Sequence, residues 1–342
     1  MTFARERPAR ANRRSHALWL VAAGIGAALL LVEIAARVAT RTPFLFGGLG
    51  MMDPVVGSVP RPRTALRDPF RGCSITIGDH STRSNGNTGP LAERPLTLAV
   101  GDSFTFGQDL GDSDSWPAAL ERLLGRRVIN GGVNRFGFDQ SVLRAEQLAA
   151  LYAPDTIIVS FIPHDVSRCE FSYFLGRPKP YFDVDASGLH LHPAPVPPRS
   201  AWAPAKDLLL WLSVAANILG EHALLWEGPP YAEVMHHRGE EVACRLMERL
   251  AALGQARRAQ VIVLAQQQQP STVEGERSTK DRVLACAQSN HLLTLDLFAV
   301  IDGVPTEQRA RLFNGHMTAE GNRLVANELA SLIGRQLQRG NQ

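Results

Sequence analysis

The amino-acid sequence predicts an α/β protein: a three-layer α/β/α sandwich around a five-stranded parallel sheet, preceded by an N-terminal transmembrane helix. Three observations predict it. Five short apolar runs recur after residue 95, amphipathic helical patterns lie between them, and one long uncharged run follows an arginine-rich start. Short runs that are apolar throughout are typical of parallel strands, because helices cover both faces of a parallel sheet.

The N-terminus predicts a membrane anchor. Residues 1–16 contain five arginines and one acidic residue, and we interpret them as a basic cytoplasmic tail. Residues 17–38 are apolar except for Glu33 and Arg37, so they can span a bilayer when Glu33 lies near the head groups. A cleaved signal peptide and a buried core helix are the alternatives. An anchor predicts a single-pass protein of the cell inner membrane, with its N-terminus in the cytoplasm and its C-terminal domain in the periplasm.

The rest of the chain is close to neutral. Removing the five N-terminal arginines from 36 Lys and Arg, and Glu6 from 33 Asp and Glu, leaves 31 basic and 32 acidic residues. No basic stripe remains that could bind phosphates. We therefore expect no nucleic-acid partner.

The cysteines do not predict a metal site, because none of the four belongs to a C-x-x-C pair: Cys73, Cys169, Cys244 and Cys286. The periplasm permits disulfides, yet Cys244 and Cys286 each fall in a helical pattern, where we expect buried free thiols. We expect neither a metal nor a cofactor.

Residues 39–95 form a lead-in before the regular pattern begins. They are rich in Gly, Pro, Arg, Asn and Thr and show no sustained periodicity. We expect a loop-rich segment that lies against the following domain without forming a core. The domain itself is predicted to span residues 96–336.

The elements of this domain follow in a regular order. The predicted strands span residues 96–100, 128–133, 156–162, 261–265 and 292–297. The predicted helices run from Ser115 to Leu124, across 142–152, across 242–253, around 283–284 and from Thr318 onward.

One connection, residues 165–236, is too long for a simple loop and predicts an insertion that acts as a lid or subdomain. Four of its aromatic residues are expected to pack the insertion on the core rather than line a cleft: Trp202, Trp211, Trp226 and Tyr231.

Polar residues gather where the predicted strands end. The first strand is followed by Gly101-Asp102-Ser103, the second ends with Gly131-Gly132-Val133 and the third is followed by Pro163-His164-Asp165. Gly315-His316 precedes the terminal helix. Ligands of parallel sheets bind at the carboxyl ends of the strands. These clusters are therefore the candidate active site.

The ordered set of clusters resembles the SGNH (GDSL-type) serine hydrolase family over about residues 75–336. Gly101-Asp102-Ser103 resembles the family's first block, Gly132 its second-block glycine and His316 its last-block histidine. The resemblance implies a flavodoxin-like SGNH hydrolase fold with Ser103 as nucleophile and His316 as general base. It also implies an oxyanion hole formed by the N–H groups of Ser103 and Gly132 and by His164.

The sequence departs from the family pattern at two positions. His164 stands where the family has Asn, and Asn314 stands where an Asp normally orients the histidine. An amide cannot stabilise imidazolium by charge, so Asn314 and Asp296, at the end of the fifth strand, are the candidates that remain for orienting His316. The carboxylates of Asp102 and Asp165 are expected to accept backbone N–H groups.

The predicted function is a membrane-anchored extracytoplasmic serine esterase that removes O-acyl groups, with acetyl as the expected group, from an envelope or exported glycan or a lipid. Two alternatives remain. One is an O-acyltransferase that uses the same residues on a glycan. The other is a catalytically weak glycan-binding or scaffold domain, which the departures at His164 and Asn314 motivate.

Overall fold

The structure is a computed structural model that describes residues 11–40, 50–67, 73–194, 205, 209, 212–219, 231–268 and 274–340. The chain divides into two compact units. Residues 1–48 and 202–224 form the N-terminal unit, and residues 49–201 and 225–342 form the α/β unit. Most of the predicted basic tail lies outside the described residues. So do three of the four aromatic residues that were expected to pack the insertion on the core: Trp202, Trp211 and Trp226.

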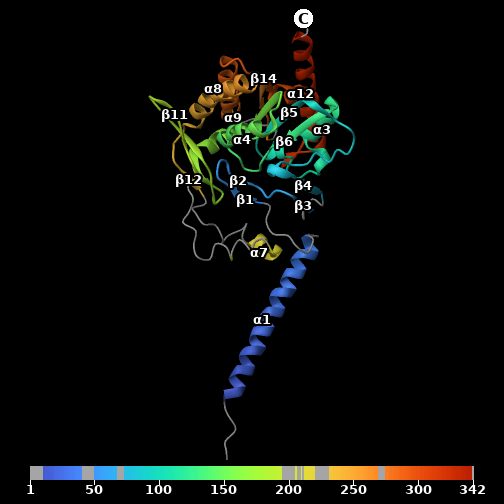
Figure 1. Ribbon diagram of the computed structural model, residues 1–342, viewed down its shortest axis with the longest axis vertical. Helices are drawn as coiled ribbons and strands as arrows, with labels where there is room; N and C mark the ends of the chain where they lie inside the picture. The colour runs from blue at the N-terminus through green and yellow to red at the C-terminus, as the bar shows by residue number, and fades with distance from the viewer. Residues whose placement is uncertain are drawn as a thin grey trace, which may run out of the picture. The chain divides into compact units, whose positions relative to one another are not determined.

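The N-terminal unit consists of a long helix and a short one. Helix α1 spans Ala11–Thr40, and its segment Ser15–Ala39 is long and apolar enough to cross a membrane. The apolar side chains of this segment are exposed along its whole length. Helix α7 (Val214–Leu219) packs beside the C-terminal end of α1 (Figure 1).

The α/β unit is built on the predicted five-stranded parallel sheet. Its strands are β5 (Ala92–Val100), β6 (Arg126–Asn130), β7 (Thr156–Phe161), β13 (Gln260–Ala265) and β14 (Leu293–Asp296). They lie in the order β14-β13-β7-β5-β6, with every neighbouring pair parallel. This is the flavodoxin-like order, in which the first strand lies between the second and the third. The predicted fold class is confirmed.

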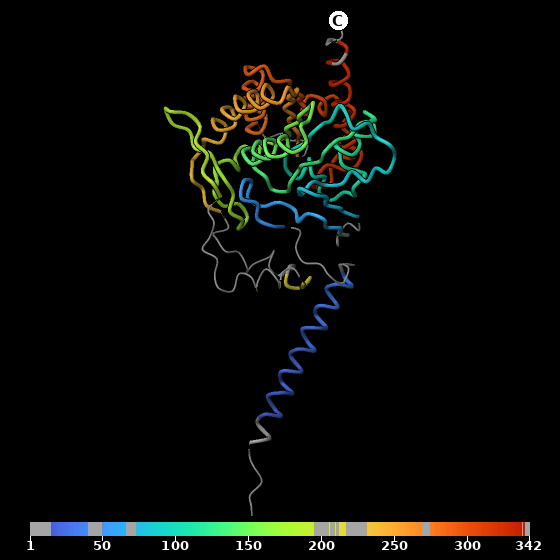
Figure 2. Tube along the Cα trace, in the orientation of Figure 1, coloured from blue at the N-terminus to red at the C-terminus, as the bar shows by residue number. Residues whose placement is uncertain are grey.

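Helices cover both faces of the sheet (Figure 1). One core contains side chains of α4 (Phe138–Tyr152), α8 (Gly239–Arg257) and α9 (Glu274–Ser289). The other contains side chains of α3 (Trp116–Leu124) and α12 (Ala319–Gly340), which run side by side, as Figure 2 shows in cyan and red. The result is the predicted three-layer sandwich.

Local sequence explains these elements. Within β7, Ile157 and Val159 enter one core and Ile158 the other, because successive side chains of a strand point to opposite faces. Helix α3 begins where Ser115 Oγ accepts a hydrogen bond from Ala118 N, with Pro117 in the first turn.

Short helices and one tiny hairpin complete the α/β unit. They are η1 (Asp79–Ser81), α2 (Ser103–Phe106), η2 (Asp112–Asp114), α5 (Pro163–Ser167), η3 (Arg168–Glu170), α10 (Leu297–Asp302), α11 (Thr306–Arg309), β15 (Phe313–Asn314) and β16 (His316–Met317).

The lead-in differs from its prediction. It contains two antiparallel pairs, β1 (Gly50–Asp53) with β2 (Gly57–Pro60) and β3 (Thr64–Arg67) with β4 (Ser74–Ile77). Two of its valines, Val56 and Val59, enter the core that contains side chains of α4, α8 and α9. The lead-in therefore lies against the domain as expected, but it contains short strands and adds side chains to the core, which was not expected. Strands of four residues are too short to show a sustained period in the sequence.

The described part of the insertion contains antiparallel strands. They are β8 (Phe171–Phe174), β9 (Arg177–Pro178), β10 (Tyr181–Asp185), β11 (Gly188–His192) and β12 (Tyr231–Glu233). Phe182 of β10 is fully buried in the core that contains side chains of α4, α8 and α9. Lys179 Nζ lies 2.6 Å from Asp139 Oδ2, and both side chains are buried. Tyr231 packs its ring edge-on against Phe171 and Phe174. This part of the insertion is therefore an integral layer of the α/β unit.

The cysteines also differ from their prediction. Cys244 on α8 and Cys286 on α9 form a disulfide, with their Cα atoms 5.2 Å apart. The expectation of two free thiols was wrong, because the packing of α8 against α9 brings together residues that lie 42 positions apart. Cys169 is a buried thiol, and burial raises its pKa well above the usual range.

Candidate active site

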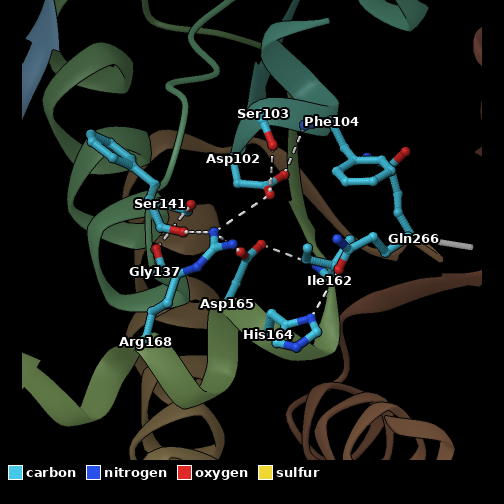
Figure 3. Close-up of polar contacts among 12 residues, drawn as sticks. Asp102, Ser103, Phe104, Gly137, Ser141, Ile162, His164, Asp165, Arg168 and Gln266 are labelled. Atoms are coloured by element: carbon cyan, nitrogen blue, oxygen red, sulfur yellow. Dashed lines mark hydrogen bonds and ion pairs between the residues drawn. The ribbon is translucent and has the colours of Figure 1, made fainter. Parts of the chain in front are cut away.

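Ser103 is placed by the turn that ends β5. It is the first residue of α2, and Asp102 caps this helix by accepting a hydrogen bond from Phe104 N at 3.0 Å (Figure 3). Ser103 itself is 7% exposed. It lies between the ends of β5 and β7, at the point where the strand order reverses and ligands of such sheets bind.

Two glycines allow α2 to pack this tightly against the sheet. A Cβ atom on Gly101 would lie 2.3 Å from Thr105 Oγ1 and 2.9 Å from Ser160 O. A Cβ atom on Gly132 would lie 2.3 Å from Phe106 N. Backbone atoms cannot yield at such distances, so both positions require glycine for the close approach.

His316 reaches Ser103 from the β15–β16 hairpin. Gly315, with φ +77°, forms the tip of this hairpin, and the reversal brings His316 Nε2 to 3.0 Å from Ser103 Oγ. The ring of His316 also packs against that of Phe104, with centroids 5.2 Å apart. The structure thus brings together the two residues that the sequence predicts as nucleophile and base.

Asn322 ties this hairpin to the rest of the unit. Its buried side chain accepts a hydrogen bond from Trp116 N at 2.8 Å and donates one to Met317 O at 3.0 Å. Met317 is the neighbour of His316 on β16. One amide therefore holds the histidine strand against the start of α3.

The second nitrogen of His316 is bound by Asp109, a residue that the sequence did not single out. Asp109 Oδ2 lies 3.0 Å from His316 Nδ1, and both side chains are about three-quarters buried. A proton on Nδ1 donated to this carboxylate leaves Nε2 as an acceptor for the hydroxyl of Ser103. Ser103, His316 and Asp109 form the hydrogen-bonded chain of a Ser-His-Asp arrangement.

The prediction that Asn314 or Asp296 orients His316 is therefore wrong. Asn314 pairs with His316 along the hairpin backbone and is exposed, and Asp296 binds Lys280 Nζ at 2.7 Å and caps α10 through Phe298 N. Neither of them occupies His316 Nδ1 in the described structure, because Asp109 does.

Arg83, from the lead-in, holds the loop that carries Asp109. Its guanidinium donates to three carbonyl oxygens around this loop, those of Phe106, Gly107 and Leu110. Arg83 is buried, and burial lowers the pKa of its guanidinium while the nearby Asp112 carboxylate opposes the shift. Asp109 has φ +69°, a conformation that Asp tolerates better than most residues.

A buried carboxyl pair lies beneath Ser103 (Figure 3). Arg168 Nη1 donates to Asp165 Oδ1 at 2.6 Å and lies 3.6 Å from Asp102 Oδ2. Burial and the Asp102 carboxylate raise the pKa of Asp165 well above its usual range, against the effect of Arg168. The prediction that both carboxyls bind backbone N–H groups is confirmed, because Ile162 N donates to Asp165 as Phe104 N does to Asp102.

The predicted oxyanion donors differ in their surroundings. The N–H of Ser103 lies in the first turn of α2, where helical N–H groups have no partner within the helix. Gly132 N donates to Asn130 Oδ1 at 3.1 Å. His164 Nδ1 lies 2.9 Å from Gln268 Oε1, and in Figure 3 His164 lies at the opposite end of the drawn cluster from Ser103. The oxyanion roles of Gly132 and His164 stay predictions.

Sequence reasoning missed Asp109 and Arg83. Asp109 follows Ser103 by six residues in a Gly-rich loop, where an aspartate is an ordinary turn residue. Arg83 lies in a segment without periodicity. The one usable signal was the missing acid at position 314, which called for a carboxylate elsewhere.

Comparison with known proteins gives distant structural similarity only. No protein-family model matches the chain, and no curated protein sequence is significantly similar to it. A solved structure of a catalytic mutant of Axe2, an acetylxylan esterase from Geobacillus stearothermophilus, is similar at 15% identity, 71% coverage of this chain, 96% of that chain and a TM-score of 0.41. A GDSL-like lipase from Bacteroides thetaiotaomicron is similar at 11% identity over 72% of this chain and 89% of that chain, with a TM-score of 0.39.

LAE5, an alpha/beta hydrolase enzyme from the metagenome of Lake Arreo, is similar at 14% identity over 71% of this chain and 97% of that chain, with a TM-score of 0.43. These likenesses are too distant to carry an argument about activity. The fold rests on the strand order, which is flavodoxin-like, and Ser103 follows β5 at the carboxyl end of the sheet. Its chemistry has to be argued from the site.

Proposed function

We propose that the protein is a serine esterase that hydrolyses O-acyl esters with Ser103 as nucleophile. The observation that carries the proposal is the continuous hydrogen-bonded chain from Ser103 Oγ through His316 to Asp109, with both links at 3.0 Å. A serine hydroxyl is a weak nucleophile on its own, and an adjacent base oriented by a third group activates it.

The reaction proceeds in two halves. Ser103 Oγ forms a bond to the acyl carbon and passes its proton to His316 Nε2, which returns that proton to the alcohol oxygen as the acyl–oxygen bond breaks. In the second half His316 takes a proton from water, and the hydroxide attacks the acyl-enzyme. Ser103 leaves with the proton from His316, and the acyl group departs as a carboxylic acid.

Asp109 supports the proton transfers of both half-reactions. Its carboxylate lies against Nδ1, so it stabilises the imidazolium that forms in each half-reaction. The Ser103 N–H stabilises the developing oxyanion, and Gly132 and His164 are the further donors in the proposal. This carboxylate supplies the acid that is missing at position 314, which was one of the two departures that motivated a catalytically weak scaffold; the other, at His164, stands.

The proposed substrate is an acetylated glycan or lipid at a membrane surface. The support is the apolar segment Ser15–Ala39 behind an arginine-rich start, together with a disulfide between Cys244 and Cys286. Disulfides persist in oxidising compartments, and basic residues favour the cytoplasmic side of a span. The proposed location is therefore the inner membrane, with the α/β unit in the periplasm.

The test is hydrolysis of 4-nitrophenyl acetate together with labelling by a fluorophosphonate probe, which reacts only with an activated serine. We expect wild type to be labelled and to release acetate, and Ser103→Ala to lose both. Ser167→Ala is the matched control, because Ser167 is an exposed serine nearby on α5 that donates to His164 O. A Ser103→Ala protein with unchanged turnover, or a wild type that is never labelled, contradicts the proposal.

A further inference from the structure

Helix α1 carries a charged pair near its C-terminal end. Arg37 Nε lies 2.6 Å from Glu33 Oε1, one helical turn away. The two side chains are mostly covered, whereas apolar neighbours such as Leu29 and Val38 are exposed. Charges within a membrane-crossing helix are costly unless they are paired and hydrogen-bonded, and they mark functional contacts.

Both charges bind one segment of the distant insertion. Glu33 accepts hydrogen bonds from Ser213 Oγ at 2.7 Å, Val214 N at 3.0 Å and Ala215 N at 3.1 Å. Arg37 Nη2 donates to Leu212 O at 2.6 Å. The carboxylate thus caps the start of α7, and the guanidinium holds the carbonyl just before it. We call Glu33, Arg37 and residues 212–215 the clasp.

The segment that the clasp holds is apolar and uncharged. Residues 208–219 contain no acidic or basic side chain. Leu209 and Leu212 are 53% and 42% exposed, and the apolar side chains of α1 are exposed as well. Twelve residues are too few to cross a bilayer, but an apolar segment of this length can lie in the interface region.

We propose that Leu209 and Leu212, which precede α7, form a second membrane contact, held by the clasp at the head-group end of α1. The occupant of this surface is the lipid bilayer, because the clasp binds the exposed leucines to a helix that is long and apolar enough to cross a membrane, and residues 208–219 carry no charge. This inference rests on the membrane anchoring in the proposed function. It assigns Glu33 a role: the charge holds a second lipid-facing segment to the anchor.

The contact changes how the α/β unit is tethered. The chain passes between the two units at residues 48–49, 201–202 and 224–225, so three covalent connections join them. With the clasp closed, residues 212–215 of the insertion are held at the end of α1.

The test uses the full-length protein in liposomes with a nitrobenzoxadiazole label on Leu212→Cys. Leu191→Cys is the matched control, because Leu191 on β11 is 43% exposed and belongs to the α/β unit. We expect spin-labelled lipid to quench the Leu212 label and aqueous iodide to spare it, with the reverse at Leu191. Labelled wild type measures the background from Cys73 and Cys169.

Glu33→Ala tests the clasp itself. The substitution makes α1 more apolar, so the anchor is retained, but three hydrogen bonds to the insertion disappear. We expect lipid quenching of the Leu212 label to be lost in this variant while the protein stays in the membrane during carbonate extraction.

The outcomes separate this inference from the proposed anchor. Release of wild type by carbonate contradicts the anchor as well. If wild type is retained but iodide quenches the Leu212 label as strongly as the Leu191 label, the second contact alone is wrong. If neither quencher reaches the Leu212 label, the second membrane contact is wrong and a protein partner covers this surface. If lipid quenching is unchanged in Glu33→Ala, the clasp does not hold the segment to α1.

Discussion

His316 is bound on both ring nitrogens, and the two contacts determine its tautomer. Asp109 accepts a hydrogen bond from Nδ1–H, so the Nε2 lone pair faces Ser103 Oγ. In Asp109→Asn an amide N–H can donate to Nδ1 and place the proton on the wrong nitrogen. We expect kcat for 4-nitrophenyl acetate to fall by about 10²–10⁴-fold, toward the loss seen when a triad acid becomes its amide.

Asn314→Asp is the matched control for this prediction. Asn314 is exposed, and Asp109 already occupies His316 Nδ1, so a carboxylate at position 314 should leave kcat unchanged. A rise in kcat in Asn314→Asp, combined with full activity in Asp109→Asn, would show that position 314 orients the histidine instead.

The raised pKa of Asp165 predicts a dependence of stability on pH. Burial beside Asp102 raises the pKa in the folded protein above the unfolded value of about 3.9. The folded state therefore binds more protons, and the contribution of Asp165 to the free energy of unfolding declines from about pH 4 upward until the folded pKa is passed.

Asp165→Asn removes this titration. We expect the difference in unfolding free energy, wild type minus variant, to decrease as the pH rises from 4.5 to 8 in urea denaturation experiments. Parallel pH profiles for the two proteins would mean that Asp165 is ionised in the folded state across this range.

Helices α8 and α9 are joined by packing and by a covalent link. Their disulfide closes a loop between Cys244 and Cys286, which lie 42 positions apart. Closing a loop of this length restricts the unfolded chain and stabilises a fold by about 2–4 kcal/mol. We expect a Cys244→Ala, Cys286→Ala double variant to lose this amount in urea denaturation.

Cys73→Ser is the control, because Cys73 lies outside the disulfide and its replacement leaves the α8–α9 link intact. Dithiothreitol should lower the stability of wild type and of this control alike and leave the double variant unaffected. Equal stability of wild type with and without reductant would exclude a stabilising role for the link.

The whole chain is predicted to have one topology in the membrane. With residues 1–16 in the cytoplasm, a tag before Met1 should survive protease treatment of intact spheroplasts and be lost only after lysis. A tag after Gln342 should be removed from intact spheroplasts. Protection of the C-terminal tag, or recovery of the protein in the soluble cytoplasmic fraction, would contradict the proposed location.

The sequence by itself determined the sheet strands, the helices around them, the apolar N-terminal helix, and Ser103 and His316 as candidates. Each of these is recorded in a few neighbouring residues: an uncharged run, a helical period, or polar residues directly after a strand. The place of the candidate site then followed from the rule that ligands bind at the carboxyl ends of parallel strands, and the structure has Ser103 directly after β5.

Only the tertiary structure decided which partners these residues have. The contacts of His316 with Asp109, of Glu33 with Ser213 and of Cys244 with Cys286 join positions 207, 180 and 42 residues apart. No local pattern encodes such pairs, because the residues next to an aspartate in a turn or a cysteine on a helix do not show which distant residue it contacts. The partner is set by how strands and helices pack, and that packing depends on the whole chain.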